Sequence, residues 1–278
     1  MVPEVGDFCV LLPVYRGDNA AFFRRAVSSV TLDQTLRPAE LVVVVDGPVG
    51  PSLTAALDDL GAGRLSGGVP VRFVPLPENV GLARALEAGL AACSHEVVAR
   101  ADADDVSLPQ RFERQIPLVA DGLDLLGSAI TEFESDESLP GVTRTLPTAA
   151  SEIAEMARFR DPFNHPSVVY RRSAVAAAGG YEHLDKMEDY WLFARMVAAG
   201  ARVANLAEPL VLYRVGAGAY GRRGGGGMLA SELRLQWRFL RAGFTTPAQF
   251  VRNVAVRGGY RIVPAGLRKP AYRVMIRR

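Results

Sequence analysis

Apolar runs of strand length alternate with amphipathic segments along the first half of the chain. Strands are expected at residues 8–14, 40–46, 71–76 and 96–101. Between them, helices are expected at residues 53–60 and 82–92 and in a segment that ends at Val30 and is capped by Asp18 or Asn19. Strand, helix and strand at this spacing predict βαβ units and a parallel sheet with helices on both faces.

The pattern changes after Asp105. Further helices are expected at residues 108–120, 151–158 and 188–199, and further extended segments at 123–130, 167–170 and 203–213. The segment 131–147 is polar and rich in turn-forming residues, which indicates an excursion or a hairpin. Glycines 224–227 predict a flexible break, after which the pattern is helical to about Val256.

Composition limits the class of protein. The 278 residues, 49% of them hydrophobic, can form one large α/β domain or one domain with an appendage. No run of roughly 18 apolar residues predicts a membrane span, and the first residues lack the pattern of a signal peptide. Cys9 and Cys93 lie in apolar surroundings, so we expect buried thiols rather than a disulfide.

The net charge of +2 conceals an acidic body and a basic tail. The first 232 residues carry 21 basic and 30 acidic groups, a net charge of −9, whereas 11 basic and no acidic residues follow Glu232. Aliphatic and aromatic residues lie among these basic residues, which fits an anionic membrane surface better than a nucleic acid. A helical cap with a solvated basic face explains the composition equally well, and both interpretations stay open.

Three carboxylates follow the fourth expected strand within four residues, namely Asp102, Asp104 and Asp105. Ligands bind at the carboxyl ends of parallel strands, and clustered carboxylates repel one another unless a cation joins them. Mg²⁺ and Mn²⁺ prefer oxygen ligands and keep positions open for phosphate. One aspartate could cap the following helix, but capping does not explain three, so we favour a metal–diphosphate site.

A second carboxylate pair, Glu188 and Asp189, opens the helix expected at residues 188–199. Acidic side chains are favoured at a helix N-terminus, and this ordinary stabilisation explains the pair by itself. A metal site that binds a leaving group gives the pair a second interpretation. Asp189 would then be the general base that deprotonates a nucleophile.

Asp46 and Tyr15 each end an expected strand on the same edge of the sheet. Asp46 is either a turn residue before Gly47 or a hydrogen-bond acceptor for a base or a ribose. Tyr15 would lie beside that pocket. The sequence leaves both interpretations of Asp46 open.

Residues 216–221 match the pattern GxGxxG, which often marks dinucleotide binding. The context differs, because no βαβ unit follows and no acidic residue lies about 20 residues further on to bind a ribose. We therefore expect residues 216–227 to form a mobile loop. Its arginines, Arg222 and Arg223, either close over a diphosphate or are solvated.

Two further residues carry weaker signals. His165, in the sequence Asn164-His165-Pro166-Ser167, is one of three histidines. A single histidine is more often structural than a ligand. Trp191 could stack on a sugar ring, but a core position is the expected one.

Five short motifs occur in a fixed order along the chain. They are Pro13-Val14-Tyr15, Val45-Asp46-Gly47, Asn79-Val80-Gly81-Leu82, Ala101-Asp102-Ala103-Asp104-Asp105 and Glu188-Asp189-Tyr190-Trp191. Together they resemble the family 2 glycosyltransferases, and the longer strings at 99–113 and 220–225 resemble the bacterial exopolysaccharide branch, which includes enzymes of amylovoran synthesis. The resemblance implies the GT-A fold, an α/β architecture with a Rossmann-like, mostly parallel sheet flanked by helices, and inversion at the anomeric carbon.

The resemblance also assigns a nucleotide pocket. Asp46 would contact the uracil of a UDP-sugar, Pro13 and Tyr15 would line the pocket, and Arg84 would lie near it. Many relatives have two acidic residues before the glycine of the second motif, whereas Val45 takes the first of these positions here.

The resemblance further assigns the metal site and the base. Asp102 and Asp104 would serve the ribose–diphosphate and a divalent metal, Mn²⁺ or Mg²⁺, with Asp104 the more direct ligand. Asp189 would be the base, and Glu188 would help to position the acceptor. A histidine common in the family near the end of the last strand is replaced here by Val215, so no metal ligand is expected from that position.

We therefore expect a metal-dependent inverting glycosyltransferase in cell-surface polysaccharide synthesis, with a nucleotide-sugar donor and a saccharide or lipid-linked acceptor. The catalytic domain is expected to span 1–215, and a glycine-rich loop with a basic helical C-terminal extension 216–278. The expected location is the cytoplasm, at the inner face of the membrane. A sugar-nucleotide pyrophosphorylase is an alternative, although residues 13–20 lack its phosphate loop, and a non-catalytic nucleotide-sugar-binding module is another.

Overall fold

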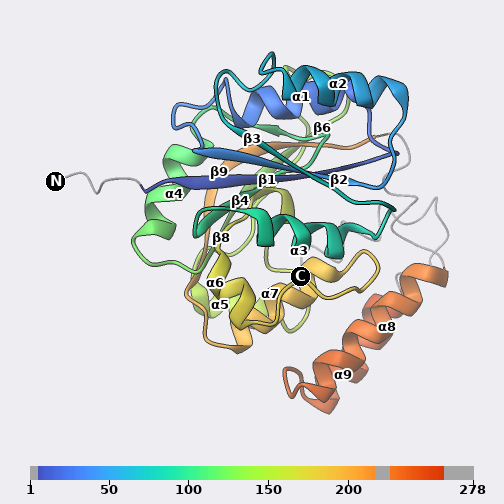
Figure 1. The fold of residues 1–278 in the computed structure, drawn as a ribbon. Helices are drawn as coiled ribbons and strands as arrows, with labels where there is room; N and C mark the ends of the chain where they lie inside the picture. The colour runs from blue at the N-terminus through green and yellow to red at the C-terminus, as the bar shows by residue number, and fades with distance from the viewer. Residues whose placement is uncertain (1–5, 217–225, 260–278) are drawn as a thin grey trace.

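A central sheet with helices on both faces organises the chain in a computed structural model that describes residues 6–216 and 226–259 (Figure 1). Its strands are β1 (Phe8–Tyr15), β2 (Glu40–Asp46), β3 (Val71–Pro75), β4 (Val97–Arg100), β5 (Val106–Ser107), β6 (Leu125–Phe133), β7 (Thr143–Arg144), β8 (Val169–Arg171) and β9 (Val203–Arg214). The helices are α1 (Ala20–Val30), α2 (Pro51–Gly61), α3 (Leu82–Ala92), α4 (Arg111–Ala120), α5 (Ala150–Met156), the 3₁₀ turn η1 (His165–Ser167), α6 (Arg172–Ala177), α7 (Glu188–Ala198), α8 (Gly226–Arg241), α9 (Pro247–Asn253) and the π-helical η3 (Val254–Gly258).

The first half of the sheet is parallel, as the βαβ pattern predicts. The strand order is β3-β2-β1-β4-β8-β6-β9-β5, and neighbouring strands from β3 to β4 all run in parallel. Side chains of β1 alternate between two cores, because successive residues of a strand point to opposite faces. Phe8, Val10 and Leu12 pack with α1, α2 and α4, whereas Cys9 and Leu11 pack with α3 and α7. Both cysteines are buried free thiols.

The second half of the sheet is mixed. Strand β8 runs antiparallel to both of its neighbours, and β7 returns antiparallel to β6, which forms the hairpin expected within residues 131–147. Residues Val106–Ser107 were expected to lead into a helix but instead pair with Leu212 and Val211 of β9. This pairing joins segments about one hundred residues apart, which no local pattern reveals. The expected α/β class is confirmed.

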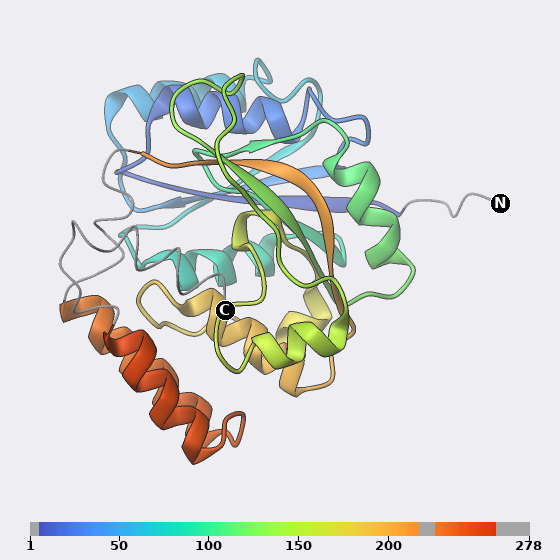
Figure 2. The same ribbon diagram turned by 180° about the vertical axis from the view of Figure 1, so that it is seen from behind.

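Helices α8 and α9 lie to one side of the sheet and contact it through α7 (Figures 1 and 2). Aromatic rings of Tyr190 and Trp191 on α7 pack against Phe239 on α8. A buried ion pair of Arg257 Nε with Glu232 Oε1, 2.6 Å long, joins η3 to α8. Within the described ranges, no helix is long and apolar enough to cross a membrane.

Candidate active site

The acidic loop, defined here as residues 101–105, links the carboxyl end of β4 to β5. Because β5 pairs with β9, the loop is held at both ends by the sheet. Arg214, the last residue of β9, donates its backbone N–H to Asp105 Oδ1 (2.8 Å) and its Nε–H to the carbonyl oxygen of Asp104 (2.9 Å). The three aspartates are therefore fixed at the sheet edge where ligands bind in α/β proteins.

Arg100 is a buried cation at the centre of this site. Both terminal nitrogens of its guanidinium donate to the two oxygens of Asp102, and only 3% of the Arg100 side chain is exposed. No pattern in the sequence singled out Arg100. An arginine at the end of an apolar strand could have indicated this ion pair, because a buried arginine requires an anionic partner.

The chemistry of the loop suits a hard divalent cation. Among the described residues Asp105 Oδ2 is buried without a hydrogen-bond partner, and Arg214 donates to the backbone carbonyl of Asp104 rather than to its carboxylate. Burial and the charge of Asp102 raise the pKa of Asp104 to about 6, and the same two causes raise the pKa of Asp105 well above its ordinary value. A Mg²⁺ or Mn²⁺ ion would relieve this accumulated negative charge, so the oxygen donors fit such an ion.

Asp18 is a fourth carboxylate at this edge, in the turn after β1. Its Oδ2 accepts the backbone N–H of Tyr15 (2.9 Å), while Asn19 caps α1 by accepting from the N–H of Ala21 (2.8 Å). Burial and the nearby charges of Asp104 and Asp102 raise the pKa of Asp18 to about 7. The sequence left the choice of cap open, and the structure resolves it in favour of Asn19, which leaves Asp18 to face the acidic loop.

Glu188 and Asp189 form the first turn of α7, as expected. Asp189 Oδ1 accepts the N–H of Tyr190 (2.8 Å), and Asp189 Oδ2 lies 3.5 Å from Nδ1 of His165. Burial raises the pKa of both carboxyls, and the charge of Asp189 helps to raise that of Glu188 to about 7. Buried carboxyls with raised pKa values are suited to proton transfer.

The two acidic segments are close enough to interact electrostatically. The charge of Asp102 raises the pKa of Asp189, and the charge of Arg100 lowers the pKa of Glu188, Asp189 and Asp104. Residues nearly ninety positions apart in the sequence thus lie within electrostatic range of one guanidinium. The fold brings the candidate metal site and the candidate base together.

Asp46 connects two of the short motifs. Its carboxylate accepts hydrogen bonds from the N–H of Val80 (2.7 Å), the N–H of Gly81 (3.1 Å) and Nδ2 of Asn79 (2.9 Å). Gly47 is required beside it, because its φ is +81° and a Cβ there would lie 2.5 Å from the backbone nitrogen of Asn79. Asp46 therefore stabilises the turn that precedes α3. Its contact with uracil, which the family resemblance implies, stays a prediction.

The other residues assigned to the nucleotide pocket lie at or near the same edge. Pro13 is buried within β1, while Tyr15 ends that strand with an exposed ring that lies over Gly17. Arg84 is exposed in the first turn of α3, next to the loop that Asp46 holds. Arg222 and Arg223 lie outside the described residues.

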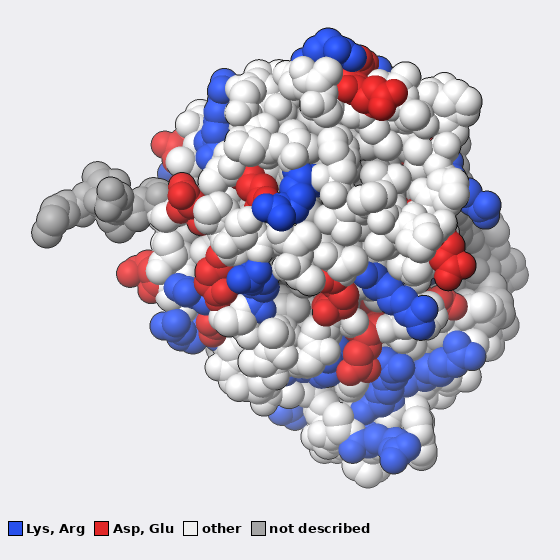
Figure 3. All heavy atoms as spheres, in the orientation of Figure 1, with Lys and Arg blue, Asp and Glu red and all other residues white. Residues whose placement is uncertain are grey.

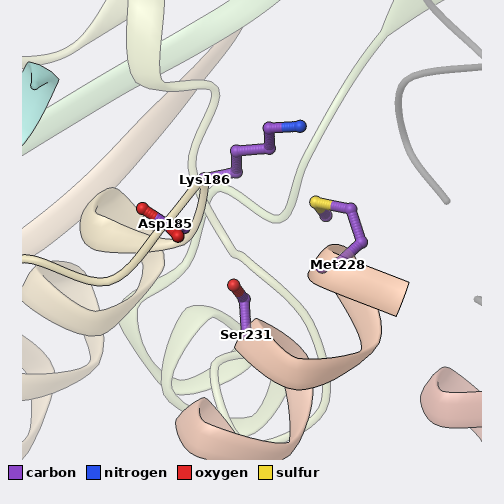
Figure 4. Close-up of a pocket in the computed structure, with 5 residues that line it drawn as sticks. Asp185, Lys186, Met228 and Ser231 are labelled. Carbon is purple, nitrogen blue, oxygen red and sulfur yellow. The ribbon is translucent and has the colours of Figure 1, made fainter. Parts of the chain in front are cut away.

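A pocket of about 290 Å³ opens just before the carboxylate pair of α7. It is lined by Asp185 and Lys186 on one side and by Met228 and Ser231 of α8 on the other (Figure 4). The hydroxyl of Ser231 points toward this space. Lys186 has a φ of 59°, in the left-handed region that few non-glycine residues adopt.

Comparisons with known proteins identify the family of this chain. Residues 9–179 match the family described as "Glycosyl transferase family 2". The amylovoran biosynthesis glycosyltransferase AmsE of Erwinia amylovora is 39% identical over 228 residues, 82% of this chain and 84% of that protein. The UDP-Gal:alpha-D-GlcNAc-diphosphoundecaprenol beta-1,3-galactosyltransferase of Escherichia coli is 31% identical over 280 residues, 100% of this chain and 99% of that protein.

A solved structure shows the same fold. The mannosyltransferase PcManGT from Pyrobaculum calidifontis, in complex with GDP-Man and Mn²⁺, has a TM-score of 0.63 at 15% identity and covers 95% of this chain and 72% of that chain. The chain belongs to glycosyl transferase family 2 and has the GT-A fold. It is a glycosyltransferase, which supports an enzyme over a binding module or a pyrophosphorylase.

Proposed function

We propose that this enzyme is a metal-dependent inverting glycosyltransferase that uses a nucleotide-diphosphate sugar. The arrangement of the acidic loop and the Glu188–Asp189 pair around Arg100 is the observation that supports this most directly. A diphosphate held at the loop would place the anomeric carbon of the sugar between the loop and Asp189. Inversion needs this arrangement, because the base and the leaving group act on opposite sides of that carbon.

Each acidic residue has a proposed role. Asp104 and Asp102 would hold Mn²⁺ or Mg²⁺, which when bound supplies Lewis-acid stabilisation of the leaving diphosphate. Asp102 would also serve the ribose–diphosphate. Asp189 would accept the proton of the acceptor hydroxyl while that oxygen attacks the anomeric carbon, and Glu188 would position the acceptor.

The proposed nucleotide is UDP. The Escherichia coli relative acts on UDP-Gal according to its name, and the carboxyl ends of β1 and β2 offer Tyr15 and Asp46 for the nucleotide. Pro13 would support Tyr15 from within β1, and Arg84 lies in α3 beside the loop bound by Asp46. Arg222 and Arg223 are proposed to close over the diphosphate.

The proposed acceptor is a saccharide, and in particular a lipid-linked one used in cell-surface polysaccharide synthesis. The name of the Escherichia coli relative includes GlcNAc-diphosphoundecaprenol, which supports this class of acceptor. The pocket lined by Lys186 and Ser231 lies just before α7, whose first turn contains Asp189, and would admit the acceptor next to the base.

We also propose that residues 216–278 form an extension that docks on the anionic inner face of the membrane. Trp237 on α8 and Val251 on α9 are large apolar side chains with exposures of 54% and 64%. Arg234, Arg241 and Arg252 lie exposed among them. Basic side chains also gather over this part of the molecule in Figure 3. Exposed apolar side chains surrounded by arginines suit an anionic bilayer surface.

The central test is a donor screen for UDP release. The purified enzyme is incubated with UDP-sugars and a saccharide acceptor, with Mn²⁺, with Mg²⁺ or with EDTA. We expect release of UDP only with metal, and a loss of roughly 100-fold or more in turnover for Asp189→Asn. The matched control is Asp121→Asn at the exposed end of α4, which should retain turnover.

Two results would overturn the proposal. Turnover that is equal with metal and with EDTA would remove the metal from the mechanism. Full turnover by Asp189→Asn would remove the base, as for a retaining enzyme, which needs no such residue.

A further inference from the structure

His165 lies directly against the proposed base. Its Nδ1 is 3.5 Å from Oδ2 of Asp189, and its Nε2 is 2.9 Å from the hydroxyl oxygen of Tyr181. The imidazole therefore bridges a buried phenol and the carboxylate that opens α7. The sequence analysis expected His165 to be structural, and nothing in its local sequence indicates these two neighbours.

The surroundings determine which ring nitrogen carries the proton. Burial, together with the charge of Arg100, lowers the pKa of His165 well below its ordinary value, so the ring is neutral with one N–H. Burial raises the pKa of Tyr181, so its hydroxyl keeps its proton. When that hydroxyl donates to Nε2, the single N–H lies on Nδ1 and faces Asp189. The opposite tautomer would place the lone pair of Nδ1 against a carboxylate oxygen.

The frame around His165 is rigid. His165 is the first residue of η1. The last residue of this turn, Ser167, accepts the backbone N–H of Ser128 through its Oγ (2.9 Å). The carbonyl oxygen of Ser167 accepts from Nε2 of Gln115 (2.8 Å). The ring itself packs edge-on against Phe193 of α7, at 5.7 Å between centroids. Because His165 is itself held in place, its imidazole can fix the orientation of the neighbouring carboxylate.

We infer that His165, oriented by Tyr181, is a positioning residue that fixes the carboxylate of Asp189 for attack by the acceptor. The N–H of Tyr190 donates to Oδ1, and Nδ1 of His165 lies 3.5 Å from Oδ2, so the carboxylate has a neighbour on each side that restricts its rotation. Each carboxylate oxygen keeps a second lone pair for the acceptor proton. Separations near 3.5 Å commonly shorten when substrate binds. This inference rests on the proposed role of Asp189.

Two substitutions of His165 separate positioning from packing. The amide nitrogen of asparagine can occupy the place of Nδ1, whereas that of glutamine reaches the place of Nε2. We expect His165→Gln to lower kcat about 10- to 100-fold, with the KM for the donor and the affinity for UDP and Mn²⁺ unchanged. His165→Asn should recover most of the lost kcat. His183→Gln is the control, because His183 is exposed on the loop before α7.

A double substitution adds a readout that a packing role would not give. If His165 acts through Asp189, Asp189→Asn combined with His165→Gln should be no slower than Asp189→Asn alone. Tyr181→Phe keeps the ring but removes the hydroxyl, and should lower kcat in the same direction by a smaller factor. If thermal unfolding shows that His165→Gln does not fold, Tyr181→Phe takes its place in the test. Its kcat, measured alone and in combination with Asp189→Asn, then decides whether His165 positions Asp189.

The failures of the two ideas are distinguishable. If Asp189→Asn abolishes turnover while His165→Gln and Tyr181→Phe retain the parental kcat, the base assignment stands and the role of His165 is overturned. Equal losses for His165→Asn and His165→Gln, or further loss in the double variant, would also overturn it. Full turnover by Asp189→Asn would overturn the proposed base first, and the positioning role with it.

Discussion

The backbone N–H of Arg214 donates to Oδ1 of Asp105 over 2.8 Å, and this bond joins the last strand of the sheet to the acidic loop. The guanidinium of Arg214 lies over the rings of Phe22 and Phe133, 3.8 and 4.3 Å from their centroids. The loop is therefore held by β9 and, through Phe22, by α1. Preorganised carboxylates bind a metal without first having to be ordered.

Asp104→Asn should weaken the binding of UDP in the presence of Mn²⁺ by roughly 100-fold, because it removes a charged oxygen ligand. Binding of UDP in EDTA should change little. Isothermal titration calorimetry with and without metal measures both quantities. Asp136→Asn, in an exposed turn, is the control. An unchanged effect of Mn²⁺ in the Asp104→Asn protein would exclude Asp104 as a ligand.

Asp46→Ala should destabilise the protein by about 3 kcal/mol, because three donors near the start of α3 lose a charged acceptor. Urea unfolding followed by circular dichroism measures the free energy. Asp136→Ala should cost much less, since Asp136 is exposed and its carboxylate accepts from the N–H and the hydroxyl of the neighbouring Ser138. A cost for Asp46→Ala no larger than that of the control would show that these bonds do not stabilise the fold.

Glu188→Gln should change how stability depends on pH. The pKa of Glu188 is raised to about 7 in the folded protein from an ordinary value of 4.5. Between these values the unfolded chain has released a proton that the folded chain retains, so Glu188 makes the folded state less stable as pH rises. Glutamine cannot ionise. The variant should therefore gain stability relative to the parent from about pH 5 to about pH 8.

Urea unfolding of both proteins at several pH values provides the comparison, since the other carboxyl groups contribute to both curves. Because the charge of Asp189 helps to raise the pKa of Glu188, the same comparison is made in the Asp189→Asn background. A difference in stability that stays constant across the range would show that the pKa of Glu188 is not raised.

Trp237→Ala should weaken binding to anionic vesicles by about tenfold, because the indole would no longer insert at the bilayer surface. Co-sedimentation with phosphatidylglycerol vesicles measures the affinity, and added salt should weaken it further through the arginines. Leu139→Ala removes an exposed apolar side chain from the β6–β7 connection and serves as the control. If the parent, Trp237→Ala and Leu139→Ala proteins bind the vesicles equally, a membrane role for α8 is contradicted.

Much of the fold followed from periodicity. The buried runs of β1, β2 and β4 and the amphipathic pattern of α3 are local properties, so their positions could be read directly from the chain. The strand β5 could not, because two residues have no periodicity and Val106–Ser107 becomes extended only by pairing with β9. The short helix α6 was also not anticipated.

The residues of the candidate site also fall into two groups, those that the sequence indicates and those that only the structure reveals. Asp102, Asp104 and Asp105 stand out in the sequence, because crowded carboxylates repel one another unless a cation joins them. Glu188 and Asp189 gain a catalytic interpretation only together with that metal site. Arg100 and His165 do not stand out. Their importance depends on burial and on neighbours that are distant in the chain, and neither property is present in a local pattern.

The sequence by itself determined the α/β class, the edge of the sheet at which carboxylates gather and the family to which the chain belongs. Tertiary structure alone decided that Asp102 pairs with a buried Arg100 and that Asp189 lies between Tyr190 and His165. The physical reason is the range of the interactions. Backbone periodicity acts over a few residues, whereas ion pairs and hydrogen bonds in a buried site act between segments that only the folded chain brings together.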